Sequence, residues 1–93
     1  MRSLSNIQEL YNDLCRKYNR MSVKAYFVSG EELDYKGLYV EWPFRKIYLN
    51  TDHFNDRTVY HEILHHINPS LKDGVEFEKL LDEFIDKELN EKI

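Results

Sequence analysis

The chain has 93 residues, a formal net charge of −4 and one cysteine, a composition that excludes an intramolecular disulfide framework and fits a reducing compartment. Its 42% hydrophobic and 32% charged residues predict one globular domain rather than a disordered chain. The basic residues form no block, and no apolar run approaches the roughly 20 residues that span a bilayer. We therefore expect a soluble, cytoplasmic domain with neither a nucleic-acid nor a membrane partner.

The first predicted element is a helix over residues 5–20, whose apolar residues recur every three or four positions. Ser5 and Gln8 fit the N-cap and the third helical position of a capping box. Cys15 falls on the apolar side of this helix, where we expect a small buried hydrophobic residue rather than a catalytic thiol. Residues 23–28 then alternate and are rich in β-formers, which predicts a strand.

Two further strands are predicted over residues 37–42 and 45–50, where β-branched and aromatic residues recur. The segment between them contains Pro43, which suits the second position of a tight turn, so we expect the two strands to form a hairpin.

Two helices complete the predicted fold. Asp52 or Asn55 can cap the first of them, which runs to about Ile67 and is stopped by Pro69 because proline cannot continue the hydrogen-bond ladder. The last helix is predicted over about residues 75–91, with an apolar stripe along one side. Three strands framed by three helices predict an α+β fold with one small sheet.

The motif with the clearest chemistry is His-Glu-Ile-Leu-His at residues 61–65. Two histidines four positions apart lie on the same face of a helix, so His61 and His65 can bind one tetrahedral zinc ion. Glu62 is turned about 100° away from His61, which favours a role as general base toward a water molecule rather than as a ligand. This spacing predicts a zinc site with hydrolytic chemistry.

The third protein ligand is not defined by the motif. No histidine follows His66, which points about 100° away from His65 and is a poor ligand for the same ion. We interpret His66 as a histidine of the last helical turn or as an oxyanion-stabilising group, and His53 as a surface or capping residue. The carboxylates that could complete the site, each also explicable as an acid near a helix start, are Asp73, Glu76, Glu78, Asp82 and Glu83.

Beyond this motif the chain resembles the minigluzincin and SprT-like metallopeptidases. The likeness is carried by residues 57–66, which surround the histidines, and by residues 72–77, which are similar to a His-Gly-x-x-Phe element that opens the next helix. The strand at residues 46–50 is also similar. The resemblance covers about residues 37–85, and its most specific part is the H-E-x-x-H sequence.

This resemblance implies a zincin-like minimal catalytic domain: a three-stranded sheet, a backing helix, the active-site helix and a C-terminal helix, with zinc bound and Glu62 as general base. The third histidine of the family aligns with Asp73 here, which makes Asp73 the first choice as third ligand. A gluzincin-like alternative uses Glu78, with Asp82 supporting a ligand from outside the coordination sphere, and Glu76 is a further alternative.

The function expected from these residues is zinc-dependent hydrolysis of peptide bonds in a peptide or unfolded protein. The alternatives are a non-catalytic zinc or metal-free interaction module, favoured by the missing third histidine. Residues 1–93 are expected to form one domain, in which the resemblance implies that residues 84–93 could act as a latency segment. A monomer or a homodimer, in the latter case with an exchanged last helix, fits the sequence.

Overall fold

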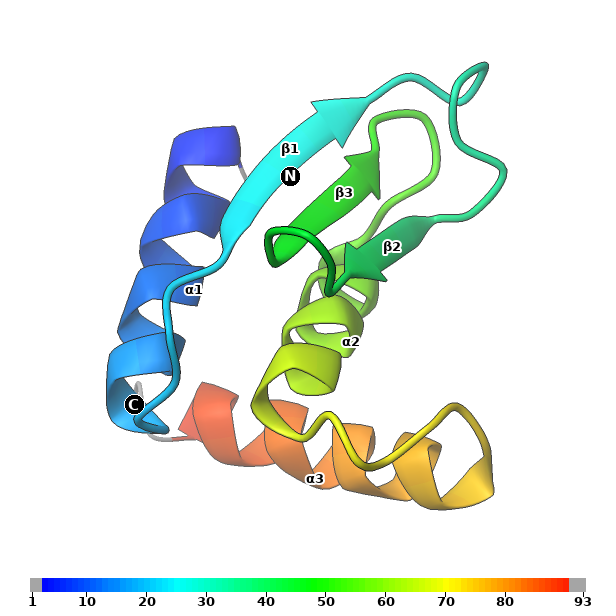
Figure 1. The fold of residues 1–93 in the computed structure, drawn as a ribbon. Coiled ribbons are helices and arrows are strands. Elements are labelled where there is room, and N and C mark those ends of the chain that lie inside the picture. The colour runs from blue at the N-terminus through cyan, green and yellow to red at the C-terminus, as the bar shows by residue number, and fades with distance from the viewer. Residues whose placement is uncertain (1–2, 91–93) are drawn as a thin grey trace.

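The computed structural model describes residues 3–90 and has an α+β fold with three helices and one mixed sheet (Figure 1). The elements in chain order are α1 (Leu4–Lys17), β1 (Lys24–Val28), β2 (Gly37–Val40), β3 (Lys46–Asn50), α2 (Asp56–Ile67) and α3 (Val75–Asn90). All six elements predicted from the sequence are therefore confirmed as to type and place. The strands are shorter than predicted at one end each, and α1 ends three residues earlier than expected.

The three strands are arranged in the order β1-β3-β2, so the last strand in sequence lies at the centre. β1 runs parallel to β3, with Ala25 opposite Ile47, whereas β2 runs antiparallel to β3, with Tyr39 opposite Ile47. The predicted hairpin is thus confirmed, and its turn contains a cis peptide bond between Trp42 and Pro43. Because β2 is an outer strand, one of its edges has no partner strand within residues 3–90.

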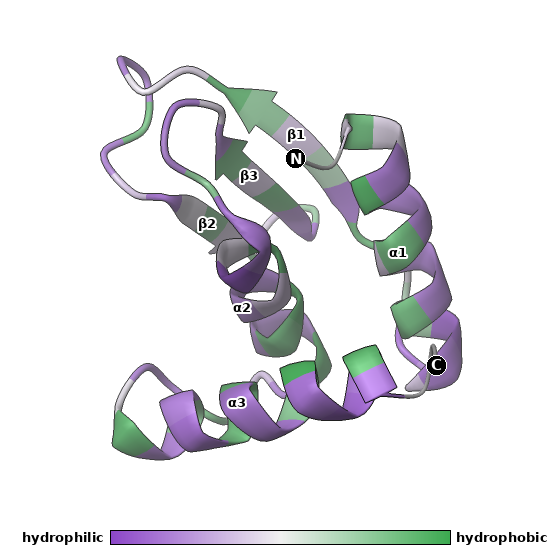
Figure 2. Cartoon of the chain, turned by 180° about the vertical axis from the view of Figure 1, so that it is seen from behind, coloured by the Kyte–Doolittle hydropathy of each residue, from purple (hydrophilic) through white to green (hydrophobic). Residues whose placement is uncertain are grey.

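Helices α1 and α2 cover one face of the sheet, with α1 along β1 and α2 beside β2 and β3 (Figure 1). The core between them is built from the inward-facing residues of the strands and the apolar sides of the helices (Figure 2). Tyr11 is fully buried and donates its hydroxyl proton to the carbonyl of Val59 over 2.8 Å, which ties α1 to α2. Cys15 is buried in this core, as predicted.

The predicted capping box at the start of α1 is wrong. Ser3 is the N-cap, with its side chain accepting a hydrogen bond from the N–H of Asn6, and Ser5 lies inside the helix. Gln8 instead reaches across to the start of β1, where its amide donates to the carbonyl of Val23, just before the strand, and accepts from the N–H of Ala25. The side chain of Gln8 therefore bonds to tertiary partners 15 and 17 residues away and not to the helix N-terminus, as a capping box would require.

The C-terminal half of α3 packs against α1. Phe84 meets Tyr18 edge to face, and the buried carboxylate of Glu88 accepts hydrogen bonds from Tyr18 and Lys17. In the predicted latency segment, Phe84 and Glu88 are therefore buried against the rest of this chain, and residues 91–93 lie outside the described residues. Within residues 3–90, no helix is both long and apolar enough to cross a membrane.

Candidate metal centre

The helix that carries the histidines is fixed at its start by Asn55, one of the two caps predicted from the sequence. Its side chain accepts from the N–H of Thr58, and the hydroxyl of Thr58 accepts from the N–H of Asn55, which satisfies two helix-end donors. Val59 and Ile63 are fully buried on the core side. This anchoring leaves the opposite side of α2 facing a cleft.

His61 and His65 lie one turn apart on that side, with their Nε2 atoms 3.3 Å apart. The loop between α2 and α3 brings Asp73 to the same place, so that its Oδ1 lies 2.9 Å from Nε2 of His65 and 3.2 Å from Nε2 of His61. Within residues 3–90 these three side chains form a group that could hold a metal ion. The structure therefore places the first-choice third ligand beside both histidines.

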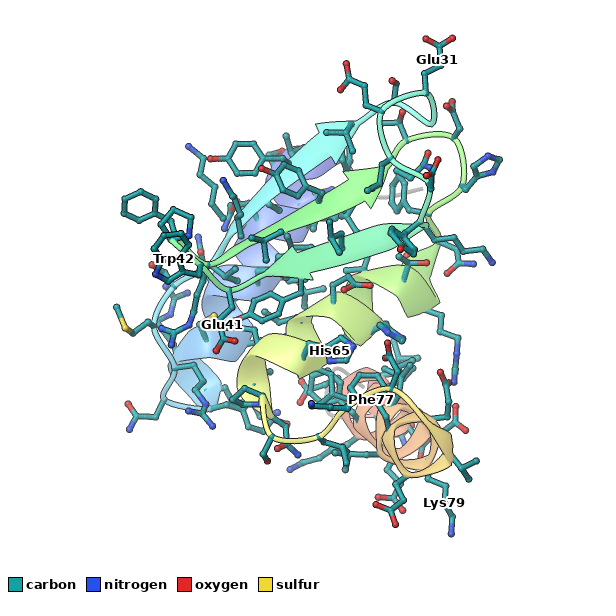
Figure 3. All side chains as sticks on the ribbon, turned by 45° about the vertical axis from the view of Figure 1, so that its right-hand side comes forward. Glu31, Glu41, Trp42, His65, Phe77 and Lys79 are labelled. Atoms are coloured by element: carbon teal, nitrogen blue, oxygen red, sulfur yellow. The ribbon has the colours of Figure 1, made fainter. Side chains whose placement is uncertain are left out.

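Phe77 supports both imidazoles from below. Its ring is stacked on His65, with centroids 4.2 Å apart and planes 18° apart, and its centroid lies 4.7 Å from that of His61. The ring of Phe77 is fully buried at the start of α3 (Figure 3). Packing against a fixed aromatic ring limits the rotamers available to the two histidines, which preorganises their nitrogen atoms.

Glu62 lies beside the cluster but is almost inaccessible to solvent, at 7% exposure. Burial, and after it the negative charge of Asp73, raise the pKa of this carboxyl from 4.5 to about 7, against the opposing effect of a hydrogen bond from the backbone N–H of Tyr39. A carboxyl with a pKa near neutrality can both accept and return a proton, which is what a general acid–base group requires.

The imidazole of His61 is also affected by its surroundings. Burial lowers the pKa of His61, and the neighbouring His65 lowers it further, against the opposing charge of Asp73. The neutral form is the one that offers a nitrogen lone pair to a metal ion. The cluster therefore favours the ligand state of His61.

The cleft over these residues has a volume of about 620 Å³ and is bounded by the outer strand β2 and the loop before it. Gly37 lies closest to the helix: a Cβ atom at this position would be 2.8 Å from Cγ2 of Thr58 and 2.9 Å from Cγ of Glu62. The absence of a side chain at Gly37 therefore allows the strand to approach the carboxylate.

The other predicted carboxylates are engaged elsewhere or exposed. Arg57, in the first turn of α2, donates hydrogen bonds to Glu78 over 2.5 Å and to Asp82 over 2.7 Å, and so joins α2 to α3. Glu76 is exposed in the first turn of α3. None of these three acids belongs to the His61, His65 and Asp73 group.

His66 lies away from the cluster, in a smaller pocket near the C-terminal end of β2. Its Nε2 lies 2.6 Å from the carbonyl of Met21, so this nitrogen carries the proton, and its Nδ1 accepts from the hydroxyl of Tyr39 over 3.0 Å. Burial lowers the pKa of His66, against the opposing effect of the Met21 carbonyl. The geometry does not bring this side chain to the position of an oxyanion-stabilising group.

Two contributors to the site were not predicted from the sequence as such. Tyr39 links β2 to both ends of the histidine motif, through its N–H to Glu62 and its hydroxyl to His66. Asn50 is buried and donates to the carbonyls of Leu33 and Tyr35, which holds the loop that borders the cleft. A polar residue at the end of an otherwise apolar strand was the available signal for Asn50.

Comparison with known proteins gives no relative: the sequence matches no protein-family model, and neither a curated protein nor a solved structure matches it. The residues of the cleft and their geometry are therefore the basis on which a function can be assigned.

Proposed function

We propose that the protein is a zinc-dependent peptidase with a zincin-like catalytic domain, in which His61, His65 and Asp73 hold the metal and Glu62 acts as general base. The observation that carries the proposal is the meeting of two imidazole nitrogens and one carboxylate oxygen beside a buried glutamate, in a cleft below a free strand edge. Each of these groups has a role in metal-assisted hydrolysis.

The size of the cluster fits zinc. Tetrahedral coordination with ligand distances of about 2.0–2.2 Å separates the donor atoms by roughly 3.3–3.6 Å. The three donor atoms are 2.9, 3.2 and 3.3 Å apart, slightly closer than this, as expected of side chains that hydrogen-bond to one another. Zinc with three protein ligands keeps an open position, which distinguishes a catalytic site from a structural one.

A bound zinc ion would polarise the scissile carbonyl and make a water molecule acidic enough to react at neutral pH. Glu62 is the residue of this chain that takes the proton of that water and passes it to the departing amine. Its burial and its raised pKa suit this exchange, and the hydrogen bond from the N–H of Tyr39 holds its carboxylate on the strand side of the cleft.

The free edge of β2 is the proposed binding surface for an extended peptide. The carbonyl of Lys36 accepts from the N–H of Asn50 in β3, whereas the N–H of Tyr39 turns the other way and meets Glu62. Since backbone groups alternate along a strand, Gly37 and Tyr39 present theirs to the cleft. A segment of peptide or unfolded protein could pair there as an added strand.

The proposal keeps the resemblance to minigluzincin and SprT-like metallopeptidases, with Asp73 in place of the third histidine. An outer strand antiparallel to the centre of the sheet lies next to the helix that carries the histidine motif. A latent state in which a neighbouring chain covers the cleft, as in a homodimer with exchanged last helices, remains part of this proposal, as does a cytoplasmic location.

The deciding experiment combines metal content with turnover. Purified wild type should contain close to one zinc per chain, Asp73→Ala should lose it, and Glu76→Ala and Glu78→Ala should keep it. Glu62→Gln should retain zinc while hydrolysis of an unfolded protein substrate falls by several orders of magnitude. Peptide hydrolysis that survives Glu62→Gln would refute the assignment, and zinc binding without hydrolysis of any unfolded substrate would favour a non-catalytic zinc module.

A further inference from the structure

Within residues 3–90, the turn between β2 and β3 carries the most exposed large apolar side chains outside the first residue of α3. Trp42 is 84% exposed and Phe44 77%, with Pro43 between them, and Met21 of the loop after α1 is 72% exposed. The guanidinium of Arg45 contacts the sulfur of Met21 at 3.6 Å, which brings the two loops together. We refer to Met21, Trp42, Pro43 and Phe44 as the apolar tip.

Such exposure requires an explanation, because large apolar side chains are rarely left this accessible together. None of the apolar-tip residues borders the proposed catalytic cleft. In Figure 3 Trp42 projects from one end of the sheet, on the opposite side from His65 and Phe77. The apolar tip is therefore a surface separate from the proposed active site.

Basic side chains surround the apolar tip. Lys24 and Lys46 are directly opposite each other in the register of β1 and β3, and Arg45 lies between Lys46 and the tip in sequence. Arg20 and Arg45 border the pocket of about 260 Å³ next to Met21. We refer to Arg20, Lys24, Arg45 and Lys46 as the basic rim.

The two lysines of this rim are not neutralised by nearby carboxylates. Within residues 3–90, Lys24 and Lys46 form no ion pair, and each ammonium group lies over a tyrosine ring of its own strand, at 5.6 and 5.7 Å. Glu41 is the acid that lines the same pocket as Arg20 and Arg45. Two like charges placed side by side on neighbouring strands repel each other, and an anionic partner would relieve this repulsion.

The rest of the chain has the opposite sign. The formal net charge is −4, and the loop after β1, which contains Glu31, Glu32 and Asp34, lies at the far end of the sheet from Trp42 (Figure 3). A protein polarised in this way is oriented by a negatively charged surface, with the apolar tip and basic rim facing it.

We propose that the apolar tip and the basic rim form a peripheral docking site for an anionic lipid bilayer. The side chains of the tip enter the boundary between headgroups and acyl chains, and the lysines and arginines of the rim contact the anionic headgroups. This inference does not depend on the proposed peptidase activity, and it replaces the expectation from sequence that the protein has no membrane partner.

The chemistry of the apolar tip favours a bilayer over other anionic or apolar partners. Bases of a single-stranded nucleic acid stack on aromatic rings, but Met21 and Pro43 offer no such platform. A second copy of this chain docked through the same surface would bring two basic rims together. Tryptophan and phenylalanine beside lysine and arginine are the residues that occupy a membrane interface.

Trp42 is the only tryptophan of the chain, so its fluorescence reports on the apolar tip without a label. The full-length protein is titrated with vesicles of phosphatidylcholine alone and of phosphatidylcholine mixed with phosphatidylserine, and bound protein is measured by flotation. We expect binding to the anionic vesicles with a blue shift of Trp42 emission, weakened by added salt. Neutral vesicles should bind much less protein.

Matched variants separate this site from general surface effects. Lys46→Glu and Phe44→Ser should each weaken partitioning by roughly tenfold or more. Lys79→Glu makes the same charge change on α3, and Val75→Ser the same kind of polar change at a residue that is 80% exposed, and both should bind as wild type does. Phe44, Val75 and Lys79 are exposed and Lys46 is half-buried in the central strand. Circular dichroism checks that each variant keeps the wild-type fold.

Four results would overturn the proposal. The first is an absence of binding to anionic vesicles, and the second is binding without a blue shift of Trp42 emission. The third is a blue shift with a single-stranded oligonucleotide but not with vesicles, which would assign the surface to nucleic acid. An equal loss of vesicle binding in Lys46→Glu and Lys79→Glu would likewise refute a defined site, because it would show that only the overall charge of the protein matters.

Discussion

The ring of Phe77 is stacked on the imidazole of His65, with planes 18° apart and centroids separated by 4.2 Å. Phe77 belongs to α3 and His65 to α2, so this contact couples the packing of the last helix to the orientation of a proposed metal ligand. The same ring also touches His61. A metal site of this kind depends on a residue that offers no ligand atom.

Phe77→Leu is therefore expected to weaken zinc affinity by about tenfold or more, because leucine keeps the site apolar but cannot stack on the imidazole of His65. Ile47→Val is the matched control, since Ile47 is as fully buried and the change costs about 0.5–1.5 kcal/mol of stability without touching a histidine. Competition with a chromogenic chelator measures both affinities. Equal affinity in the two variants would show that the stacking is incidental.

Gly37→Ala is expected to reduce peptide turnover strongly while zinc remains bound. The added Cβ would lie within 3.0 Å of side-chain atoms of Thr58 and Glu62, both buried, so Glu62 or the strand must move. Gly30→Ala is the control, because its closest neighbour is the carboxylate of the exposed Asp52, which can turn aside. Comparing kcat and zinc content in both variants tests this, and full activity in Gly37→Ala would contradict it.

Zinc is expected to raise the thermal stability of the protein. A ligand that binds only the folded state stabilises it by about 2.7 kcal/mol at a hundredfold excess over its Kd, which for a domain of this size corresponds to roughly 10–20 °C in Tm. The shift should disappear on addition of a chelator and should be much smaller in Asp73→Ala. Differential scanning calorimetry measures these shifts in Tm. An equal shift in wild type and in Asp73→Ala would show that Asp73 is not a zinc ligand.

Glu88→Ala is expected to lower the free energy of unfolding by about 1–3 kcal/mol, because the buried carboxylate that accepts hydrogen bonds from Tyr18, at 2.7 Å, and from Lys17 is removed. Glu88→Gln should cost less, since its amide oxygen can still accept this hydrogen bond. Glu83→Ala removes an exposed carboxylate of the same helix and should change stability by no more than about 0.5 kcal/mol. Chemical denaturation measures all three, and equal effects would refute a specific role of Glu88.

Cys15 is expected to react with thiol reagents only after the protein unfolds. Burial raises the pKa of this thiol above its ordinary value of 9.0, against a weaker opposing effect of the Val23 backbone. A group whose pKa is higher in the folded state stabilises the fold fully below the unfolded pKa, so stability should fall as the pH rises above about 9. Labelling of native protein at the rate seen in denaturant would contradict the burial of this residue.

The sequence predicts the elements of this fold better than their partners. The period of the apolar residues, Pro69 and the Asn55 cap define where the helices lie, and each is a local signal. Gln8 was misassigned because its partners in β1 are far away in sequence. The order of the strands could not be predicted either, since no local sequence pattern indicates which strand lies at the centre of the sheet.

The candidate site shows the same division. The spacing of His61, Glu62 and His65 is contained in one helix, so their arrangement follows from helix geometry. Asp73 was selected by resemblance, and the structure brings it to the histidines, but its role as a ligand remains a prediction. The two hydrogen bonds that fix the ring of His66 could not be predicted from local sequence. Their partners, Met21 in a loop and Tyr39 in β2, are 45 and 27 residues away.

The strand order β1-β3-β2 has a consequence for how the chain folds. β2 and β3 are joined by a short turn and form a local hairpin. β1 pairs with β3, from which it is separated in sequence by the whole of β2 and its loops. Contacts with short loops form fastest, so we expect residues 37–67 to form the nucleus, and α1 with β1 to dock afterwards. The histidine motif and the strand above it would then acquire their mutual arrangement early, before the core that protects them is complete.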